Sequence, residues 1–411
     1  MTTEREAHLM TSLSLQGDDV LRVAVISDVH AEINPEPDRP YSFLNMDIPA
    51  GDPRNPIGAL CRLISGPEKL TADIIVCPGD LGCKARPATV QYGWQQLHRL
   101  AADLKSQLII AAPGNHDFDS RCRYGNYEPS QVLKNLSPLF PFADKATNDD
   151  FWANHWVCLC NDLLRVILVD SSAYHASPAE IEHGRIAEET LHQIEQKLKS
   201  QGNRSLNLLV CHHHPEKHED LHAADYDHMQ GGQALIDQVC SSVFGHWLVI
   251  HGHRHHPKLY YARGATQDTP VVFSAGSLCA VLSPELATIA RNQFYLLELT
   301  PSLFDQSGSC VGRFRSWDWA CGRGWNPAGD GSGLPPRGGF GLRVPPQQLA
   351  DKIDESFPEQ LVKRAVILER MPQLDFLTPD GLEEMCRVLN ERHRMDVTLD
   401  RGQISEIGRM I

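Results

Sequence analysis

The chain has 411 residues, of which 42% are hydrophobic and 22% are charged, and its formal net charge is −14 at pH 7. This composition is typical of a globular protein, and the length exceeds that of one ordinary compact core, so we expect one large domain with a smaller appendage. The negative net charge disfavours duplex nucleic acid as a partner, although a negative net charge does not exclude a local basic patch. No stretch approaches the roughly 20 apolar residues that cross a membrane.

Five short polar motifs follow one another along the chain, after a leader that we expect at residues 1–20. Each comes after a short apolar run rich in Val or Ile, which predicts a strand buried on both faces. The motifs are Asp28-Val29-His30, Gly79-Asp80, Gly114-Asn115-His116-Asp117, His213-His214-Pro215 and Gly252-His253-Arg254-His255. Open α/β sheets gather ligand-binding residues at the carboxyl ends of their strands, so we expect the motifs to form a binding site there.

The motifs supply carboxylate, amide and imidazole groups, a mixture that suits two divalent ions. Imidazole combined with carboxylate favours manganese, iron or zinc over calcium, which prefers oxygen ligands alone. The candidate ligands are Asp28, His30, Asp80, Asn115, His213, His253 and His255. Two such ions carry four positive charges and the two aspartates offset only two, so the excess charge can bind a phosphate oxygen and acidify a bound water.

Taken together, the motifs resemble those of the calcineurin-like metallophosphoesterase superfamily over roughly residues 20–300. The resemblance implies an α/β (α+β) fold in four layers, a sandwich of two mixed β-sheets flanked by helices, with the metals where the strand ends converge. It assigns Asp28, His30 and His255 to one metal and Asn115, His213 and His253 to the other, with Asp80 bridging them. It also makes His116 the residue that protonates the leaving group or steadies the phosphate, with Asp117 orienting its imidazole.

The register within the histidine runs is open. Residues 212, 213 and 214 are all histidines, and successive side chains on a strand point to opposite faces. The resemblance favours the histidine two residues before Pro215, which is His213, and the Gly-His-x-His frame selects His253 and His255. The other histidines at 212, 214, 251 and 256 either support the ligands or are simply solvated. For Asp117, the alternative to orienting His116 is a helix N-cap.

Two long loops are expected at the mouth of the site. The first, residues 32–56, is rich in proline, aspartate and asparagine and directly follows the first motif. The second, residues 118–155, carries Arg121, Arg123 and Tyr124. Arginines beside aromatic residues can hold a phosphate and stack on a base, so these three residues are candidates for substrate binding. The alternative is a solvated loop with a small satellite core.

The C-terminal part differs in character from the expected main domain at residues 21–321. Glycine and proline dominate residues 322–346, which predicts a linker or long loop. Residues 347–411 predict a small helical extension, with one helix opened by Thr378-Pro379-Asp380. This extension matches no motif, and we expect it to pack on the main domain or to mediate contact with a partner or a second copy.

The cysteines indicate a reducing compartment. The chain has twelve, scattered mostly through apolar runs, and no pair has the spacing of a zinc ribbon. The first residues show neither the basic start nor the apolar run of an export signal. We therefore expect free thiols and a cytoplasmic location.

The leading interpretation is a binuclear metal-dependent phosphoesterase that hydrolyses a phosphodiester, with a nucleotide or cyclic nucleotide as the favoured substrate. Residues 184–198 resemble a segment of bacterial cyclic-nucleotide phosphodiesterases of the same superfamily. The alternatives are a DNA exo- or endonuclease whose tail caps DNA, a phosphomonoesterase, and a scaffold without catalysis. Protein Ser/Thr phosphatases are disfavoured, because Asp117 stands where that branch has Glu.

Overall fold

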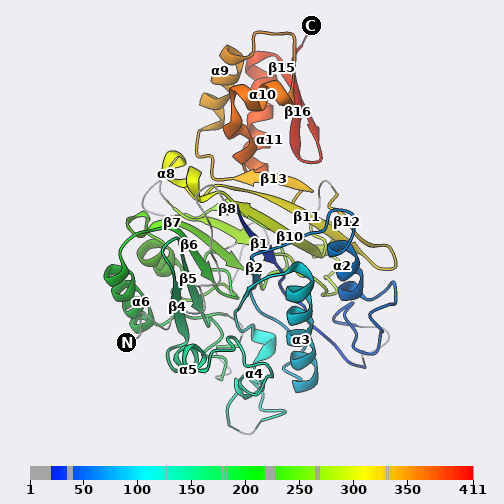
Figure 1. Ribbon diagram of the computed structural model, residues 1–411, viewed down its shortest axis with the longest axis vertical. Helices are drawn as coiled ribbons and strands as arrows, with labels where there is room; N and C mark the ends of the chain where they lie inside the picture. Colours follow the sequence, from blue (N-terminus) through cyan, green and yellow to red (C-terminus); the bar gives the residue numbers. More distant parts are fainter. Residues whose placement is uncertain are drawn as a thin grey trace.

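The computed structural model describes residues 20–34, 40–125, 127–176, 180–181, 183–217, 227–263, 269–329, 331 and 333–410. Two β-sheets pack together with helices on their outer sides, and a smaller unit of helices and strands sits at one end (Figure 1). The predicted sandwich of two mixed sheets is confirmed. The leader expected at residues 1–20 lies outside the described residues apart from Val20.

The first sheet has seven strands, in the order β12-β11-β10-β1-β2-β3, with β13 paired to β11. Strands β1, β2 and β3 run parallel, whereas β10 and β11 continue the sheet in antiparallel pairs. The strands are β1 (Leu21–Val25), β2 (Ile74–Cys77), β3 (Leu108–Ala111), β10 (Gln293–Leu299), β11 (Gly312–Ala320), β12 (Gly324–Pro327) and β13 (Arg337–Phe340). The three parallel strands are those that precede the first three polar motifs.

The second sheet has six strands, in the order β4-β5-β6-β7-β9-β8. Its four central strands are parallel, and β4 and β8 are antiparallel strands at the two edges. The strands are β4 (Trp156–Cys160), β5 (Leu164–Val169), β6 (Arg204–Val210), β7 (Gly245–His251), β8 (Lys258–Tyr261) and β9 (Val271–Ser274). Strands β6 and β7 precede the two histidine motifs.

Helices cover the outer face of each sheet. The helix α2 begins at a proline, and the side chain of its N-cap Asn55 accepts the N–H of Gly58, which satisfies one of the free donors of the first turn. The helix α6 buries the stripe Leu191, Ile194 and Leu198 against the second sheet, as a 3.6-residue period requires. The helices of this part are α2 (Pro56–Ile64), α3 (Pro87–Leu104), α4 (Gln131–Lys134), α5 (Lys145–Asn154), α6 (Glu188–Gln201), α7 (Gly232–Ala234) and α8 (Phe304–Ser307), with the short turns η1 (Asn115–Asp117), η2 (Leu235–Val239), η3 (Ser242–Phe244), η4 (Leu286–Thr288) and η5 (Pro301–Leu303).

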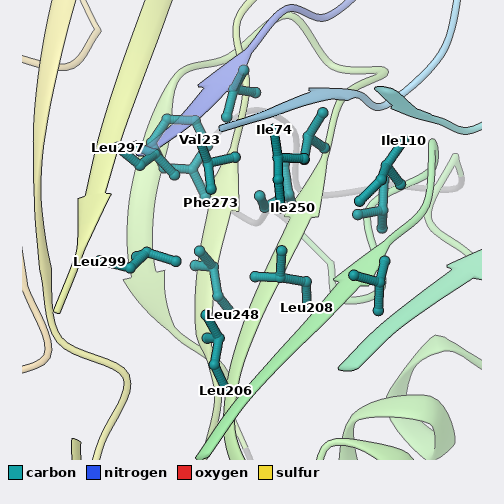
Figure 2. Packing of buried hydrophobic residues seen from close by; sticks show 14 of the residues in the cluster. Val23, Ile74, Ile110, Leu206, Leu208, Leu248, Ile250, Phe273, Leu297 and Leu299 are labelled. Carbon is teal, nitrogen blue, oxygen red and sulfur yellow. The ribbon is translucent and has the colours of Figure 1, made fainter. Parts of the chain in front are cut away.

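The main core lies between the two sheets. Val23 and Ile74 of the first sheet face Leu208, Ile250 and Phe273 of the second, and all five side chains are fully buried (Figure 2). Burying one such side chain contributes about 1.5–3 kcal/mol, so this layer fixes the two sheets against each other. The carboxyl ends of β1, β2, β3, β6 and β7 consequently meet at one edge of the sandwich.

Residues 322–346 differ from the linker that the sequence predicts, and the predicted helical extension that follows them also contains strands. Residues 322–346 carry β12 and β13, both paired with β11, so this stretch completes the first sheet instead of leaving it. The glycine- and proline-rich composition does not indicate strands, because β12 and β13 form only by pairing with β11, which is distant in the sequence. The unit that follows contains the predicted helices together with a three-stranded sheet in the order β14-β16-β15. Its elements are α9 (Pro346–Ser356), β14 (Leu361–Lys363), α10 (Arg364–Arg370), η6 (Pro372–Phe376), α11 (Pro379–Val388), η7 (Leu389–His393), β15 (Met395–Asp400) and β16 (Gln403–Arg409).

Two further expectations concern thiols and membranes. All twelve cysteines are free. None of the helices in the described part of the chain has both the length and the apolar character needed to cross a membrane.

The C-terminal unit is attached to β13 through the backbone. The N–H of Gly339 donates to the carbonyl of Leu377 at 3.2 Å, and the N–H of Leu342 donates to that of Phe376 at 3.0 Å. The Arg313 side chain lies 3.0 Å from the Asp375 carboxylate. A Cβ at position 339 would lie 2.0 Å from the Asp375 carbonyl oxygen, so only glycine permits this approach.

We expect Gly339→Val to loosen the C-terminal unit from the sandwich. The added side chain must push the 375–377 segment away, which costs about 1–3 kcal/mol by overpacking. Thermal unfolding and limited proteolysis measure the effect, as a lower Tm and faster cleavage within residues 340–346. Gly51→Val is the matched control, because nothing lies within 4 Å of a Cβ there. Equal melting temperatures and cleavage rates for the two variants would contradict the proposed attachment.

Candidate metal centre

The polar motifs occupy tight turns at the strand ends. Asp28, His30, Asp80, His253 and His255 all have positive φ, between 49° and 74°. Such a conformation costs a non-glycine residue roughly 1–2 kcal/mol, and it persists only where surrounding contacts fix it. Here the N–H of Asp28 donates to the Gly79 carbonyl at 3.0 Å and that of His30 donates to the Asp80 carbonyl at 2.9 Å. The turns after β1 and β2 therefore hold each other and direct their side chains to the same point.

Four of the predicted ligands form a first cluster. Asp28, His30, Asp80 and His255 each offer one ligand atom, and these atoms all lie within 4.8 Å of one another. The Nε2 atoms of His30 and His255 are 3.2 Å apart. Asp28 Oδ1 lies 3.2 Å from His255 Nε2, and Asp80 Oδ2 lies 3.4 Å from His30 Nε2. We name these four residues the first cluster.

A second cluster forms around Asn115, His212 and His253. Asn115 Oδ1 lies 2.9 Å from His212 Nε2 and 3.2 Å from His253 Nδ1, and the two ring nitrogens are 3.3 Å apart. Asp80 Oδ2, the same oxygen that faces His30, is 3.5 Å from His212 Nε2. One oxygen of Asp80 thus lies between the two clusters, as a bridging carboxylate must.

The geometry favours His212 over His213 in the second cluster. His212 Nδ1 lies 2.8 Å from the Pro78 carbonyl, to which it donates, and this leaves the Nε2 lone pair directed at Asn115 and Asp80. His213 instead has its Nδ1 2.9 Å from Ser171 Oγ. His212, His213 and His253 still offer ring nitrogens within 4.8 Å of one another, so His213 lies beside the cluster. Because residues 212, 213 and 214 are all histidines, the sequence alone does not show which of them faces the cluster.

The residues present fit two divalent ions. Ligand atoms that surround one ion at about 2.0–2.2 Å lie roughly 3.0–3.5 Å from one another. Most of the distances given above are close to this spacing, and His30 Nε2 and Asp28 Oδ1 are 3.8 Å apart. Acceptor atoms such as Asn115 Oδ1 and Asp80 Oδ2 converge with ring nitrogens in a buried space. This mixed oxygen and nitrogen set suits first-row transition ions.

The two buried carboxylates stay ionised because the imidazoles surround them. Burial alone would raise the pKa of Asp28, but His255 and His30 beside it hold that pKa well below its ordinary value. Burial opposes ionisation of Asp80 in the same way, and His212, His116 and His30 together lower its pKa. Conversely, Asp28 raises the pKa of His255 against the effect of burial. The site therefore keeps negative charge in a position where water is excluded.

His116 lies beside the clusters, and Asp117 has a different role from the predicted one. The N–H of His116 donates to Asp80 Oδ1 at 2.8 Å, and its ring meets that of His30 edge to face with centroids 4.9 Å apart. Burial lowers the pKa of the His116 imidazole to about 4, although Asp80 partly offsets this effect. The Asp117 carboxylate accepts three backbone N–H groups, from residues 81, 82 and 114. Among the described residues it makes no hydrogen bond to the His116 ring, so Asp117 positions the backbone.

A cleft of about 420 Å³ opens next to His116. Arg121 and Arg123, both predicted to contact substrate, line it, whereas Tyr124 lines a neighbouring cavity instead. The cleft also contains Tyr41 and Lys84, which sequence reasoning did not single out. Their positions in the sequence could have indicated a place in the cleft. Lys84 follows the second motif by four residues, and Tyr41 belongs to the loop expected at the mouth of the site.

A family model matches the part of the chain that carries both clusters. Residues 21–257 match the family model Metallophos, described as calcineurin-like phosphoesterase, and residues 338–389 match the model wHTH-Calcineurin_assc. A comparison with curated proteins finds no match. The similar solved structures include a purple acid phosphatase from yellow lupin and a dimetal phosphatase from Danio rerio. Each is 13% identical to this chain; they cover 74% and 69% of it, with TM-scores of 0.42 and 0.43. The chain spans 52% of the lupin protein and 95% of the Danio rerio protein.

We expect His212→Gln to lose bound metal to a larger extent than His213→Gln. Only the ring of His212 faces both Asn115 and Asp80, so its removal takes a ligand from the second cluster. Metal analysis of the purified, folded variants by mass spectrometry measures the difference. His192→Gln serves as the control, because that histidine is exposed on α6. Full metal content in His212→Gln together with loss in His213→Gln would restore the assignment that the sequence favours.

Proposed function

The chain belongs to the calcineurin-like phosphoesterase family, whose model matches more than half of its length, and we propose from this premise that it is a metal-dependent phosphodiesterase acting on a nucleotide or cyclic nucleotide. Family membership implies hydrolysis of phosphoesters, and the candidate metal site agrees with that chemistry. The choice of a diester and of a nucleotide is our proposal. The observation that carries it is the cleft beside His116.

The two clusters would each hold one divalent ion. We propose that His30, His255 and Asp28 hold the first and that Asn115, His212 and His253 hold the second, with Asp80 between them. The donor set favours manganese, iron or zinc. Two divalent ions bound there would supply charge for the phosphate oxygens and a nucleophilic water near neutral pH. The protein contributes the rigid spacing, because turns under strain keep these ligands in place before any ion arrives.

His116 would serve the leaving group. Its backbone is fixed on both sides, by the bond from its N–H to Asp80 and by the bond from the Ala85 N–H to its carbonyl at 2.6 Å. With its pKa lowered to about 4, the ring is neutral before substrate binds. A bound phosphodiester brings negative charge, which favours protonation of the ring. The imidazole then donates a proton to the departing oxygen or a hydrogen bond to the phosphate.

The cleft supports a diester over a monoester. A monoester has one ester arm, and the metal centre alone can accommodate its other phosphate oxygens, whereas a diester has a second arm that requires walls. The cleft of about 420 Å³ extends from His116 along the 118–123 segment and includes Tyr41 from the first loop. Both loops expected at the mouth of the site thus contribute to it. Free thiols throughout the chain support our proposal of a cytoplasmic location.

A nuclease with a DNA-reading tail is the main alternative, because the C-terminal match is to a winged helix-turn-helix model. In such a module the second helix of the motif enters the major groove, where it needs basic side chains. Here the candidate helix α11 is acidic, and its Arg387 bonds to Glu384 and Glu391. The hairpin of β15 and β16 also packs against the sandwich, because a Cβ at Gly402 in its turn would lie 2.4 Å from the Arg337 carbonyl oxygen. We propose that this unit contacts a protein partner or a second copy instead.

We expect hydrolysis of bis-p-nitrophenyl phosphate to exceed that of p-nitrophenyl phosphate. The second ester arm gains contacts with the cleft that a monoester lacks. Turnover should rise with added manganese and stop with a chelator. Cyclic nucleotides and single- and double-stranded DNA complete the screen. A preference for the monoester would favour the phosphomonoesterase alternative, and a preference for DNA would favour the nuclease.

We expect His116→Ala to keep its bound metal but to lose activity. Loss of general acid help costs about 10²–10⁴-fold. The loss should be smaller for a good leaving group such as p-nitrophenolate than for a nucleoside alkoxide, which needs the proton. Rates on both substrate types and metal content are the measurements, with His192→Ala as the control. Equal losses on the two substrates would remove His116 from the acid role, and loss of metal would make it a ligand.

A further inference from the structure

The cleft beside the metal centre is lined by cations, although the chain as a whole is acidic. Lys84, Arg121 and Arg123 line it, whereas the net charge of the protein is −14. Within the part of the chain that the structure describes, none of these three side chains forms an ion pair. Three cations without carboxylate partners at one opening leave a local positive charge, which attracts anions.

Asp119, the one carboxylate among the described residues that line the cleft, does not offset this charge freely. Its side chain is 4% exposed. One carboxylate oxygen accepts the N–H of Arg123 at 2.8 Å, and the other accepts those of Tyr124 and Gly125 at 2.6 and 2.9 Å. The carboxylate is therefore used to fold the 119–125 loop, and this loop carries both arginines to the cleft.

Lys84 is held in place by its backbone. It has φ of 57°, and Ala85 after it has φ of 52°, both in the left-handed region that favours glycine. The Ala85 N–H donates to the His116 carbonyl at 2.6 Å, which fixes the turn against the proposed acid. Glycine would adopt this backbone conformation with less strain than lysine does. The turn alone therefore does not explain why a lysine stands next to the residue that is bonded to His116.

The ammonium group of Lys84 also has a fixed position. Its Nζ lies 3.7 Å from the centroid of the Tyr41 ring, a cation–π contact, and it makes no hydrogen bond to any residue that the structure describes. Tyr41 is 48% exposed, and its backbone N–H donates to Glu32 at 2.9 Å. The turn after β2 thus presents a positioned ammonium group to the cleft, and Tyr41 of the first loop holds it there.

We propose that Lys84, with Arg121 and Arg123, binds a second phosphate group of the substrate, apart from the phosphate that is hydrolysed. The substrate class is then a nucleotide phosphodiester that carries a further phosphate, and this inference rests on the proposed function. The proposed metal centre would supply the positive charge for the scissile phosphate, so the three cations in the cleft are available for a second phosphate. Lysine and arginine bind phosphate through charge-assisted hydrogen bonds, whereas a neutral ester arm gives them no partner.

Binding of two ligands that differ by one phosphate tests the proposal. Isothermal titration calorimetry compares thymidine 5′-monophosphate with thymidine 3′,5′-bisphosphate on the manganese-supplemented full chain. The wild-type protein should bind the bisphosphate at least about tenfold more tightly, and Lys84→Gln should reduce this preference about tenfold, because a charge-assisted hydrogen bond is lost. Lys84→Arg should retain most of the preference.

Lys105→Gln is the matched control, because Lys105 is an exposed lysine with a similar φ of 59° at the end of α3. This variant should keep the wild-type preference. Equal binding of the two ligands by the wild-type protein, or an unchanged preference in Lys84→Gln, would overturn the second phosphate site. Turnover of bis-p-nitrophenyl phosphate is measured separately. If the preference depends on Lys84 but no diester is hydrolysed, the phosphodiesterase proposal fails while the second phosphate site stands.

Discussion

The buried carboxylate of Asp80 is the constraint on which the site depends. It is 1% exposed, and one of its oxygens lies 3.4 Å from His30 Nε2 and 3.5 Å from His212 Nε2. A buried carboxylate is costly unless hydrogen bonds and opposite charge compensate it. Its other oxygen accepts the His116 N–H, which supplies one hydrogen bond. The remaining compensation must come from the two clusters, and cations between them would provide it. Both sheets therefore meet at this one group: β2 presents the aspartate, and β1 and β6 present its neighbours.

Much of the fold could be predicted because its parallel strands have a recognisable local sequence pattern. Each of β1, β2, β3, β6 and β7 is a short run of apolar residues followed at once by a polar turn, and a strand buried on both faces permits few other patterns. The order of the motifs then placed their side chains at one edge, and Asp28, His30, Asp80 and His255 do converge there. Strand ends are thus readable from local sequence, since burial fixes the strand and chemistry fixes the residue after it.

The details that the sequence did not predict depend on contacts between distant segments. The orientation of His212 is set by the carbonyl of Pro78, 134 residues away, and that of His213 by Ser171, which follows β5. Asp117 accepts backbone N–H groups from the turn after β2, which no local pattern around residue 117 indicates. Similarly, β12 and β13 are glycine- and proline-rich strands that exist because β11 offers an edge to pair with. Apart from the Ser171 hydroxyl, the partner in each case is a backbone group, and the amino-acid composition carries no information about which backbone groups pair.

The proposed chemistry and the proposed choice of substrate depend on different parts of the structure. Most of the proposed metal ligands occupy turns with positive φ at the strand ends, so we expect a change at Asp28 or His255 to alter whether the centre forms at all. Arg121 and Arg123 belong to a loop that is folded by its own Asp119, so we expect a change there to alter substrate choice and to leave the proposed ligands in place. Lys84 stands between these two regions, because its turn is bonded to the His116 backbone while its ammonium group faces the cleft. Under our proposals, a substrate held by Lys84 would be placed relative to His116 by a single short stretch of backbone, and recognition of one phosphate would be coupled to proton transfer at the other.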